Sequence, residues 1–448
     1  MSAGGNPSNQ AKPFDFSKFN FDVFQFHKSY QRGFLKALPQ IDHKTLFGIP
    51  IYKGFKHMPS FTPFRLKDQN FQINYDSISN LQDKQAQQVE VKRQFQDKLE
   101  LIQPEQFRFS KGVAIIYNPN SGKNRDIRKI ITSYFEIRNI RYQLFETKRI
   151  SHGIEYAKTI DISQYDALMA VGGDGTLHEV VNGMLKREDK LKVPLIMMPN
   201  GTGNDFCASI DVFDYKDVLM DLQNPSKFKI DVLKVSIDKE NTEEIPSTGE
   251  DKHIRYSIIN SCISLLASSS VEAKKYKKFL GSSAYILTSV KGLLTHKSQY
   301  YDVEIDDQKV LTNFNTIILN VCNGKYAGGM NAINGYGFIN DGLTEINICR
   351  NVLEQKNLSS LNEIRKLIDE ITKKGGTHVY NPNFYNYRGK KIKVINKSSR
   401  DGIKEQRHLV LDGEEFQFQD FVIYDVLPEE IEIIIDYERL LKKSQYFI

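Results

Sequence analysis

One glycine-rich segment is a candidate phosphate-binding turn. It consists of Gly172, Gly173, Asp174, Gly175 and Thr176. It follows an apolar run typical of a buried strand and precedes a run with helical spacing. Glycines there let the backbone bend tightly and approach a phosphate without a Cβ in the way. The first N–H groups of the helix can then receive negative charge. Taken alone, such a segment is often only a turn.

Two further polar turns occupy comparable places in the chain. Residues 118–123 (Asn-Pro-Asn-Ser-Gly-Lys) and 199–206 (Pro-Asn-Gly-Thr-Gly-Asn-Asp-Phe) each follow an apolar run. Because the carboxyl ends of parallel strands meet at one edge of a sheet, the three turns together predict a ligand crevice. None has the spacing of a P-loop or of a dinucleotide-binding fingerprint.

The elements that must position these turns are those of an α/β domain. Strands are predicted at residues 113–117, 142–145, 166–171 and 194–198. Apolar residues recur at helical spacing between them, at 127–135, 152–159 and 177–185. Strands that alternate with helices predict a parallel sheet covered by helices on both faces.

The second half of the chain has mostly strand-like patterns. Beyond residue 229 the strand candidates are 230–237, 256–263, 301–305, 315–321, 344–349, 391–395 and 409–411. We expect a sheet-dominated second domain. The sequence predicts four segments. Residues 1–110 form an extension without its own core, and residues 111–228 form an α/β nucleotide domain. Residues 229–426 form a β-rich substrate domain, and residues 427–448 form a strand and tail that return to the first domain. The run 421–435 reads as two strands.

Composition excludes several classes of protein. The chain has 448 residues with 40% hydrophobic residues, 26% charged residues and a net charge of +6. We see no secretory signal and no apolar run long enough to cross a bilayer. The four cysteines lie far apart, which argues against a zinc site and for a reducing compartment. We therefore expect an intracellular protein, cytoplasmic or mitochondrial, with no nucleic-acid partner.

In combination, the motifs resemble the superfamily of lipid kinases that contains diacylglycerol, sphingosine and ceramide kinases. The resemblance covers about residues 112–435. After the three turns come Asn323-Gly324-Lys325-Tyr326, Asn340-Asp341-Gly342 and Asp412-Gly413-Glu414, in the family's order. NAD kinases and phosphofructokinases share the Gly-Gly-Asp-Gly turn, but the later elements favour lipid kinases. The resemblance implies a three-layer, doubly wound, parallel-sheet domain of the NAD kinase/phosphofructokinase type, followed by an antiparallel β-rich domain.

The resemblance also implies roles for individual residues, with ATP and Mg²⁺ as cofactors. Glu414 would be the general base, and Asp341, as a metal ligand, would join a magnesium-linked network with Asp205. The nucleotide pocket would contain Asn118, Lys123, Thr147, Gly172, Gly173, Asp174, Gly175, Thr176, Glu179 and Thr202. Judged by their local sequences alone, Asp341 and Glu414 lie in segments typical of hairpin turns.

The acceptor side departs from the family's pattern. Relatives often carry a glycine and a nearby acidic residue where this chain has residues 264–268, Ser-Leu-Leu-Ala-Ser. Two hypotheses follow. In the first, the protein is a lipid kinase acting at a membrane surface on a diacylglycerol-like or sphingoid hydroxyl. In the second, the fold is a weakly active or inactive scaffold in a larger, mitochondrial complex, and the N-terminal extension binds a protein partner. Lysines 274, 275, 277 and 278 fit either headgroup contacts or a solvated helix face.

Overall fold

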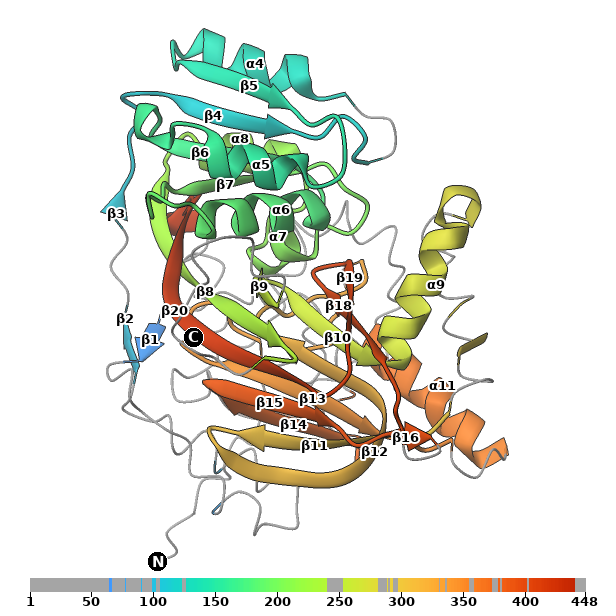
Figure 1. Cartoon of the computed structure of the whole chain (residues 1–448). Coiled ribbons are helices and arrows are strands. Elements are labelled where there is room, and N and C mark those ends of the chain that lie inside the picture. The colour runs from blue at the N-terminus through green and yellow to red at the C-terminus, as the bar shows by residue number, and fades with distance from the viewer. Residues whose placement is uncertain are drawn as a thin grey trace, which may run out of the picture. The chain divides into compact units, whose positions relative to one another are not determined.

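The computed structural model describes residues 64–66, 77, 90, 99–101, 105–122, 126–239, 253–280, 288, 291–292, 297–329, 331–334, 337–353, 358–372, 378, 381–400 and 403–439. Most of the predicted N-terminal extension lies outside these residues. A 16-stranded sheet extends through the described part of the chain (Figure 1). Within that part, no helix is both long and apolar enough to cross a membrane.

The first lobe has parallel strands alternating with helices. Its four strands, in the spatial order β7-β6-β4-β5, are β4 (Val113–Tyr117), β5 (Tyr142–Glu146), β6 (Ala167–Gly172) and β7 (Leu195–Pro199). β4, β6 and β7 are buried along their whole length, as expected of apolar strands covered on both faces. The helices are α4 (Arg128–Ile137), α5 (His152–Thr159), α6 (Asp174–Leu185), α7 (Asp205–Ser209) and α8 (Tyr215–Asp221), with a 3₁₀ turn at Ile162–Gln164. The prediction of an α/β domain is confirmed.

The second lobe is antiparallel and has its own core. Its main strands are β8 (Ser226–Ile237), β9 (Ile254–Ser257), β10 (Asn260–Ser264), β11 (Gln299–Ile305), β12 (Gln308–Cys322), β13 (Thr344–Arg350), β14 (Phe384–Gly389), β15 (Lys391–Asn396), β18 (Arg407–Leu411), β19 (Glu414–Phe418) and β20 (Phe421–Ile435). Two helices accompany them, α9 (Leu265–Leu280) and α11 (Leu358–Thr372). Short strands complete the set: β1 (Phe64–Leu66), β2 (Leu99–Leu101), β3 (Glu105–Gln106), β16 (Ser399–Arg400) and β17 (Ile403–Lys404). This confirms the predicted β-rich second part.

Two paired strands, β8 and β20, run from one lobe into the other and contribute side chains to both cores. β20 pairs antiparallel with β15 and β8, and its Ile433 pairs parallel with Leu195 of β7. The sequence predicts two strands here, but a register shift between Leu427 and Ile431, with Glu429 at φ 52°, absorbs the interruption as a bulge. The predicted boundaries at 228/229 and 426/427 fall inside continuous strands, β8 and β20.

The strand predicted at 256–263 is divided in two. β9 ends at Ser257 and β10 begins at Asn260. Between them, the N–H groups of Ile258 and Ile259 donate to the carboxylate of Asp412, at 3.1 and 3.0 Å. A buried side chain therefore replaces the strand partner for these two backbone groups.

Candidate nucleotide and catalytic site

The three predicted turns lie together at the carboxyl edge of the parallel strands. Asn118 Nδ2, after β4, donates to Thr176 Oγ1, after β6, at 2.9 Å. The turn after β7 packs backbone to backbone on the turn after β6, since a Cβ on Gly201 would overlap Gly173 Cα. A glycine is therefore needed at this close approach. The crevice expected from three separate motifs is present as one contiguous surface.

Two other predicted nucleotide residues border this surface. Thr147 follows β5, is buried, and donates its N–H to the carbonyl oxygen of Tyr117 at 2.8 Å. Thr202 is exposed in the turn after β7. Lys123 lies outside the described residues.

Glu179 holds two helices together. Its Oε1 accepts from Ser151 N and its Oε2 from Gly153 N, both at 2.8 Å. Glu179 belongs to α6 and the two amides lie at the start of α5, where N–H groups lack intrahelical partners. These contacts give Glu179 a positioning role. Its contact with nucleotide remains a prediction.

Asp174 and Asp205 form a carboxylate pair beside the glycine-rich turn. Their Oδ2 atoms would lie 2.9 and 3.6 Å from a Cβ on Gly203, so the absence of that Cβ leaves a space between the two carboxylates. Burial and the Asp205 charge raise the pKa of Asp174 to about 7. From the second lobe, Gly329 N donates to Asp205 at 3.0 Å.

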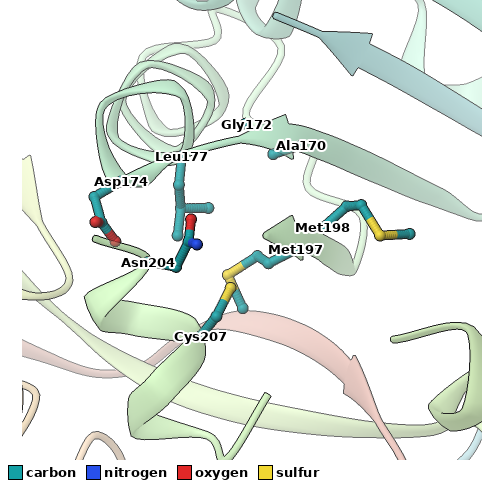
Figure 2. A pocket seen from close by; sticks show the side chains of 9 residues that line it. Ala170, Gly172, Asp174, Leu177, Met197, Met198, Asn204 and Cys207 are labelled. Carbon is teal, nitrogen blue, oxygen red and sulfur yellow. The ribbon is translucent and has the colours of Figure 1, made fainter. Parts of the chain in front are cut away.

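Asp174, which is partly buried, lines a small pocket. Figure 2 shows Asp174 on one side of it, with the sulfur-containing side chains of Met197 and Cys207 on the other. The remaining lining residues are Ala170, Gly172, Gly173, Leu177, Met198 and Asn204. This largely apolar lining disfavours a charged carboxylate and favours its neutralisation by a proton or a cation.

Glu414 reaches the glycine-rich turn from the second lobe. It is the first residue of β19, after a turn in which Asp412 and Gly413 have φ of 49° and 91°. Its Oε1 lies 3.1 Å from the point that a Cβ on Gly175 would occupy. Its Oε2 lies 3.9 Å from Lys274 Nζ, and its side chain is 45% exposed. The structure therefore brings the predicted base and the predicted phosphate turn together, with the base open to solvent.

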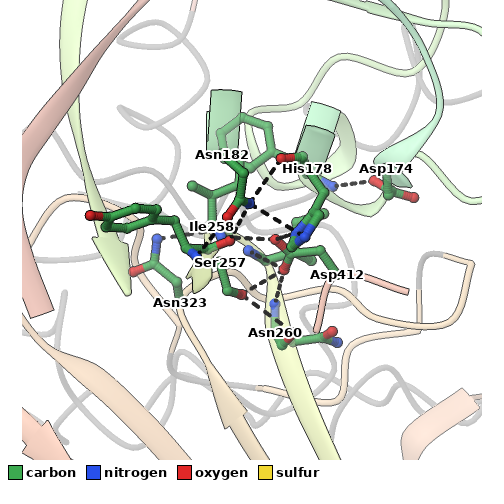
Figure 3. A network of polar contacts seen from close by, with 11 residues as sticks. Asp174, His178, Asn182, Ser257, Ile258, Asn260, Asn323 and Asp412 are labelled. Atoms are coloured by element: carbon green, nitrogen blue, oxygen red, sulfur yellow. Dashed lines mark hydrogen bonds and ion pairs between the residues drawn. The ribbon is translucent and has the colours of Figure 1, made fainter. Parts of the chain in front are cut away.

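A buried network around Asp412 connects the two lobes (Figure 3). Asp412 Oδ1 accepts from Ser257 Oγ at 2.6 Å and from the N–H groups of Ile259 and Asn260 at 3.0 Å. Its Oδ2 lies 3.1 Å from both Ile258 N and His178 Nδ1 of α6. Neither Asp412 nor His178 has a role predicted from the sequence, although Asp412 lies two residues before the predicted base.

Asn182 makes a second link one turn along α6. Its amide pairs with the backbone of Tyr256 in β9: Nδ2 donates to the carbonyl oxygen at 2.8 Å, and Oδ1 accepts from the N–H at 3.0 Å. The helix that begins at the glycine-rich turn is therefore fixed to the β9–β10 segment at two positions. We call His178, Asn182, Asp412 and their partners in 256–260 the inter-lobe network.

Asp341 lies in a different buried network. Arg388 forms ion pairs with Asp341 and with Glu345, whose Oε1 is 2.8 Å from Arg388 Nε. Burial raises the pKa of both carboxyls, that of Glu345 to about 8. Asn334 Nδ2 donates to Glu345 Oε2 at 2.9 Å. With a guanidinium as its partner, Asp341 fits a direct metal ligand poorly, and the Asp174–Asp205 pair fits a cation better.

No cluster of three or more His, Cys, Asp or Glu side chains that could hold a metal occurs among the described residues. A site of two carboxylates remains compatible with Mg²⁺, which usually takes one or two protein carboxylates and fills its other positions with water and phosphate oxygens. The two carboxylates beside Gly203 supply that number of protein ligands.

Comparisons with known proteins show which family the chain is similar to. The family model of the diacylglycerol kinase catalytic domain matches residues 112–235, and that of the YegS C-terminal NAD kinase beta sandwich-like domain matches residues 258–435. Sphingosine kinase 1 of Arabidopsis thaliana is 40% identical over 107 residues, 22% of each chain. A diacylglycerol kinase of Staphylococcus epidermidis is 28% identical over 291 residues, 63% of this chain and 82% of that protein.

Solved structures show the same fold. A putative diacylglycerol kinase from Bacillus anthracis superposes with a TM-score of 0.52 at 18% identity, over 74% of this chain and 99% of that one. The match to the Arabidopsis sphingosine kinase spans only about a fifth of that protein's length.

Proposed function

The chain belongs to the lipid kinase superfamily that includes the diacylglycerol and sphingosine kinases, and on that basis we propose that it is an ATP- and Mg²⁺-dependent kinase of a lipid hydroxyl. The acceptor would be a diacylglycerol-like or sphingoid lipid, met at a membrane surface. The observation that carries the proposal is the approach of Glu414 to Gly175 in the glycine-rich turn.

The proposed reaction transfers the γ-phosphoryl group of ATP. The phosphates lie along the turns that contain Asn118, residues 172–176 and Thr202, where the N–H groups at the start of α6 receive negative charge. Glu414 accepts the hydroxyl proton as the acceptor oxygen bonds to the γ-phosphorus, and the bond from that phosphorus to the ADP oxygen breaks. Phosphoryl transfer depends mainly on positioning and charge neutralisation, which these elements supply.

Asp174 and Asp205 would hold the magnesium ion in the space beside Gly203. When bound, Mg²⁺ neutralises charge on the transferring phosphates. The raised pKa of Asp174, about 7, fits a carboxyl that ionises when a cation arrives. Asp341 would not be a direct ligand of this ion, since Arg388 engages its carboxylate.

The test is the substitution Glu414→Gln in the full-length protein, assayed with labelled ATP and a panel of lipids in mixed micelles. Loss of a general base should reduce turnover about 10²–10⁴-fold. Glu415→Gln is the matched control, because successive strand residues face opposite sides of a sheet and Glu415 pairs with His408. Equal product from the wild-type protein and Glu414→Gln would refute the base assignment.

The scaffold hypothesis has a distinct outcome in the same experiment. The departure at residues 264–268 is the observation that favours it. Wild-type protein that labels no lipid and co-elutes from native extract with a large assembly would support it. Labelled lipid from a monomer or dimer would count against it.

A further inference from the structure

A lysine lies beside the proposed base. Lys274 Nζ is 3.9 Å from Glu414 Oε2, and the two side chains are 41% and 45% exposed. Lys274 belongs to α9, which continues directly from β10, and β10 pairs with β18 of the hairpin that carries Glu414 (Ser261 opposite Leu411). The helix also packs on β18. The fold therefore holds Lys274 next to the base.

The other described acidic side chains on α9 and on the β18–β19 hairpin already have partners, and the Asp174–Asp205 pair lies on the opposite lobe, at the glycine-rich turn. The first turn of α9 has no acidic residue, and the acidic residue further along, Glu272, is ion-paired with Lys291. Asp412 accepts hydrogen bonds from the β9–β10 segment, and Glu415 pairs with His408 at 3.2 Å. Next to Lys274, the exposed Lys275 adds a second positive charge.

The charges around Glu414 affect which acceptor lipids can approach it. A general base must come within about 3 Å of the hydroxyl whose proton it removes. In a free sphingoid base, an ammonium group sits on the carbon next to the one that bears this hydroxyl, so it would enter the same region. Lys274 offsets the attraction that Glu414 would exert on that ammonium and repels it directly. The corresponding carbon of a diacylglycerol bears an uncharged ester.

On this basis we propose that Lys274 is a specificity-determining residue, which makes the site select hydroxyl lipids without a neighbouring cationic amine, that is, neutral glycerolipids over free sphingoid bases. The inference rests on the proposed kinase function and narrows its substrate class. It also gives residues 264–268 a role in substrate choice. This segment ends β10 and begins α9, and it places no carboxylate near the base that could attract an ammonium group.

The test compares two lipids that differ by N-acetylation, which removes the positive charge of the nitrogen. Sphingosine and N-acetylsphingosine have the same reacting hydroxyl, but only sphingosine carries an ammonium group near pH 7. Presented with dioleoylglycerol in mixed micelles, the wild-type protein should phosphorylate dioleoylglycerol and N-acetylsphingosine in preference to sphingosine. Lys274→Met should raise the sphingosine to N-acetylsphingosine rate ratio about tenfold, the scale of a partly solvated charge pair, and Lys274→Glu should raise it further.

Lys275→Met is the matched control, since it removes the same charge from the adjacent exposed position. It should leave the ratio within about twofold of wild type. A wild-type preference for sphingosine, or a ratio that is unchanged in Lys274→Met, would overturn the proposal. A ratio that rises equally in both variants would also overturn it, because the effect would then belong to the general charge of α9.

Failure of the proposed function has a separate signature. If the wild-type protein phosphorylates no lipid, the kinase proposal fails, and binding then decides the charge inference. Fluorescent sphingosine and its N-acetyl form, in neutral detergent micelles, would be titrated with the wild-type protein and with Lys274→Met. The inference is supported if the wild-type protein binds sphingosine more weakly than the N-acetyl form and Lys274→Met binds the two lipids more equally. Equal binding, or tighter binding of the charged lipid, refutes it.

Discussion

Gly175→Ala should separate stability from catalysis. Gly175 is the second residue of α6. In a helix interior alanine is favoured over glycine by about 0.5–1 kcal/mol, which is an upper limit for this N-terminal position. The new Cβ would lie 3.1 Å from Glu414 Oε1, closer than ordinary van der Waals contact, so the half-exposed carboxylate must move. Because that side chain can swing into solvent, we expect the free energy of unfolding to stay equal or to rise by up to about 1 kcal/mol.

Catalysis should respond in the opposite direction. A displacement of about 1 Å in a catalytic group can cost about 10²-fold in rate, so we expect kcat for lipid phosphorylation to fall by about 10- to 100-fold. The assays are urea unfolding and labelled-lipid formation on one preparation. Unchanged kcat, or a loss of stability above 1 kcal/mol, would refute the proposed placement of Glu414.

Gly183→Ala provides the control on the same helix. Its Cβ would overlap the carbonyl oxygen of Ile154 and lie 2.7 Å from Ala157 Cβ, at the packed contact between α6 and α5. Backbone and buried side chains cannot yield there, so the change should destabilise the fold by about 1–3 kcal/mol. The two substitutions should therefore have opposite effects on stability.

Three further predictions concern buried polar groups. Asp412→Asn should lower the free energy of unfolding in urea by about 2–4 kcal/mol and should also lower kcat. An amide cannot accept hydrogen bonds from all five donors that face the carboxylate. Unchanged stability would contradict this prediction. Arg388→Met should lower the free energy of unfolding by about 3–5 kcal/mol, because it leaves Asp341 and Glu345 without a cation. Adding Asp341→Asn and Glu345→Gln should restore most of that stability. A triple variant as unstable as the single one would contradict this explanation. The third prediction concerns Asp174. Below pH 3.8 its carboxyl is protonated in both the folded and the unfolded chain. As the pH rises towards 7, only the unfolded chain loses this proton, so the free energy of unfolding without metal should fall by at most about 4 kcal/mol. Asp174→Asn should flatten that dependence and Mg²⁺ should reduce it in the wild type, as thermal unfolding from pH 4 to 8 would show.

The three glycine-containing turns could be predicted from the sequence because they depend on local rules. A buried apolar run followed by glycines and a helical stripe specifies a strand, a turn and a helix. Parallel strands then bring Asn118 and Thr176 to one edge. No further tertiary information was needed for that part of the site.

The networks behind the site could not be predicted because they depend on long-range packing. The hydrogen bond between His178 and Asp412 joins residues 234 positions apart, and nothing near either residue specifies its partner. Arg388 likewise lies 47 positions from Asp341, whose own segment reads as a plain turn. Lys274 read equally well as part of a solvated face, because its neighbour Glu414 comes from a distant hairpin.

The continuous strand β20 limits how this protein can move. A hinge between lobes needs a short flexible connection, but here a 15-residue strand, paired along most of its length with β8, spans the junction. Opening the gap between Gly175 and Glu414 by rigid rotation would break or bend that ladder, and bending is easiest at the bulge between Leu427 and Ile431. In the proposed kinase, nucleotide would then enter and leave through movement of turns and side chains while β20 stays in place. The backbone amides of β20 on either side of the bulge should be among the slowest to exchange with deuterium.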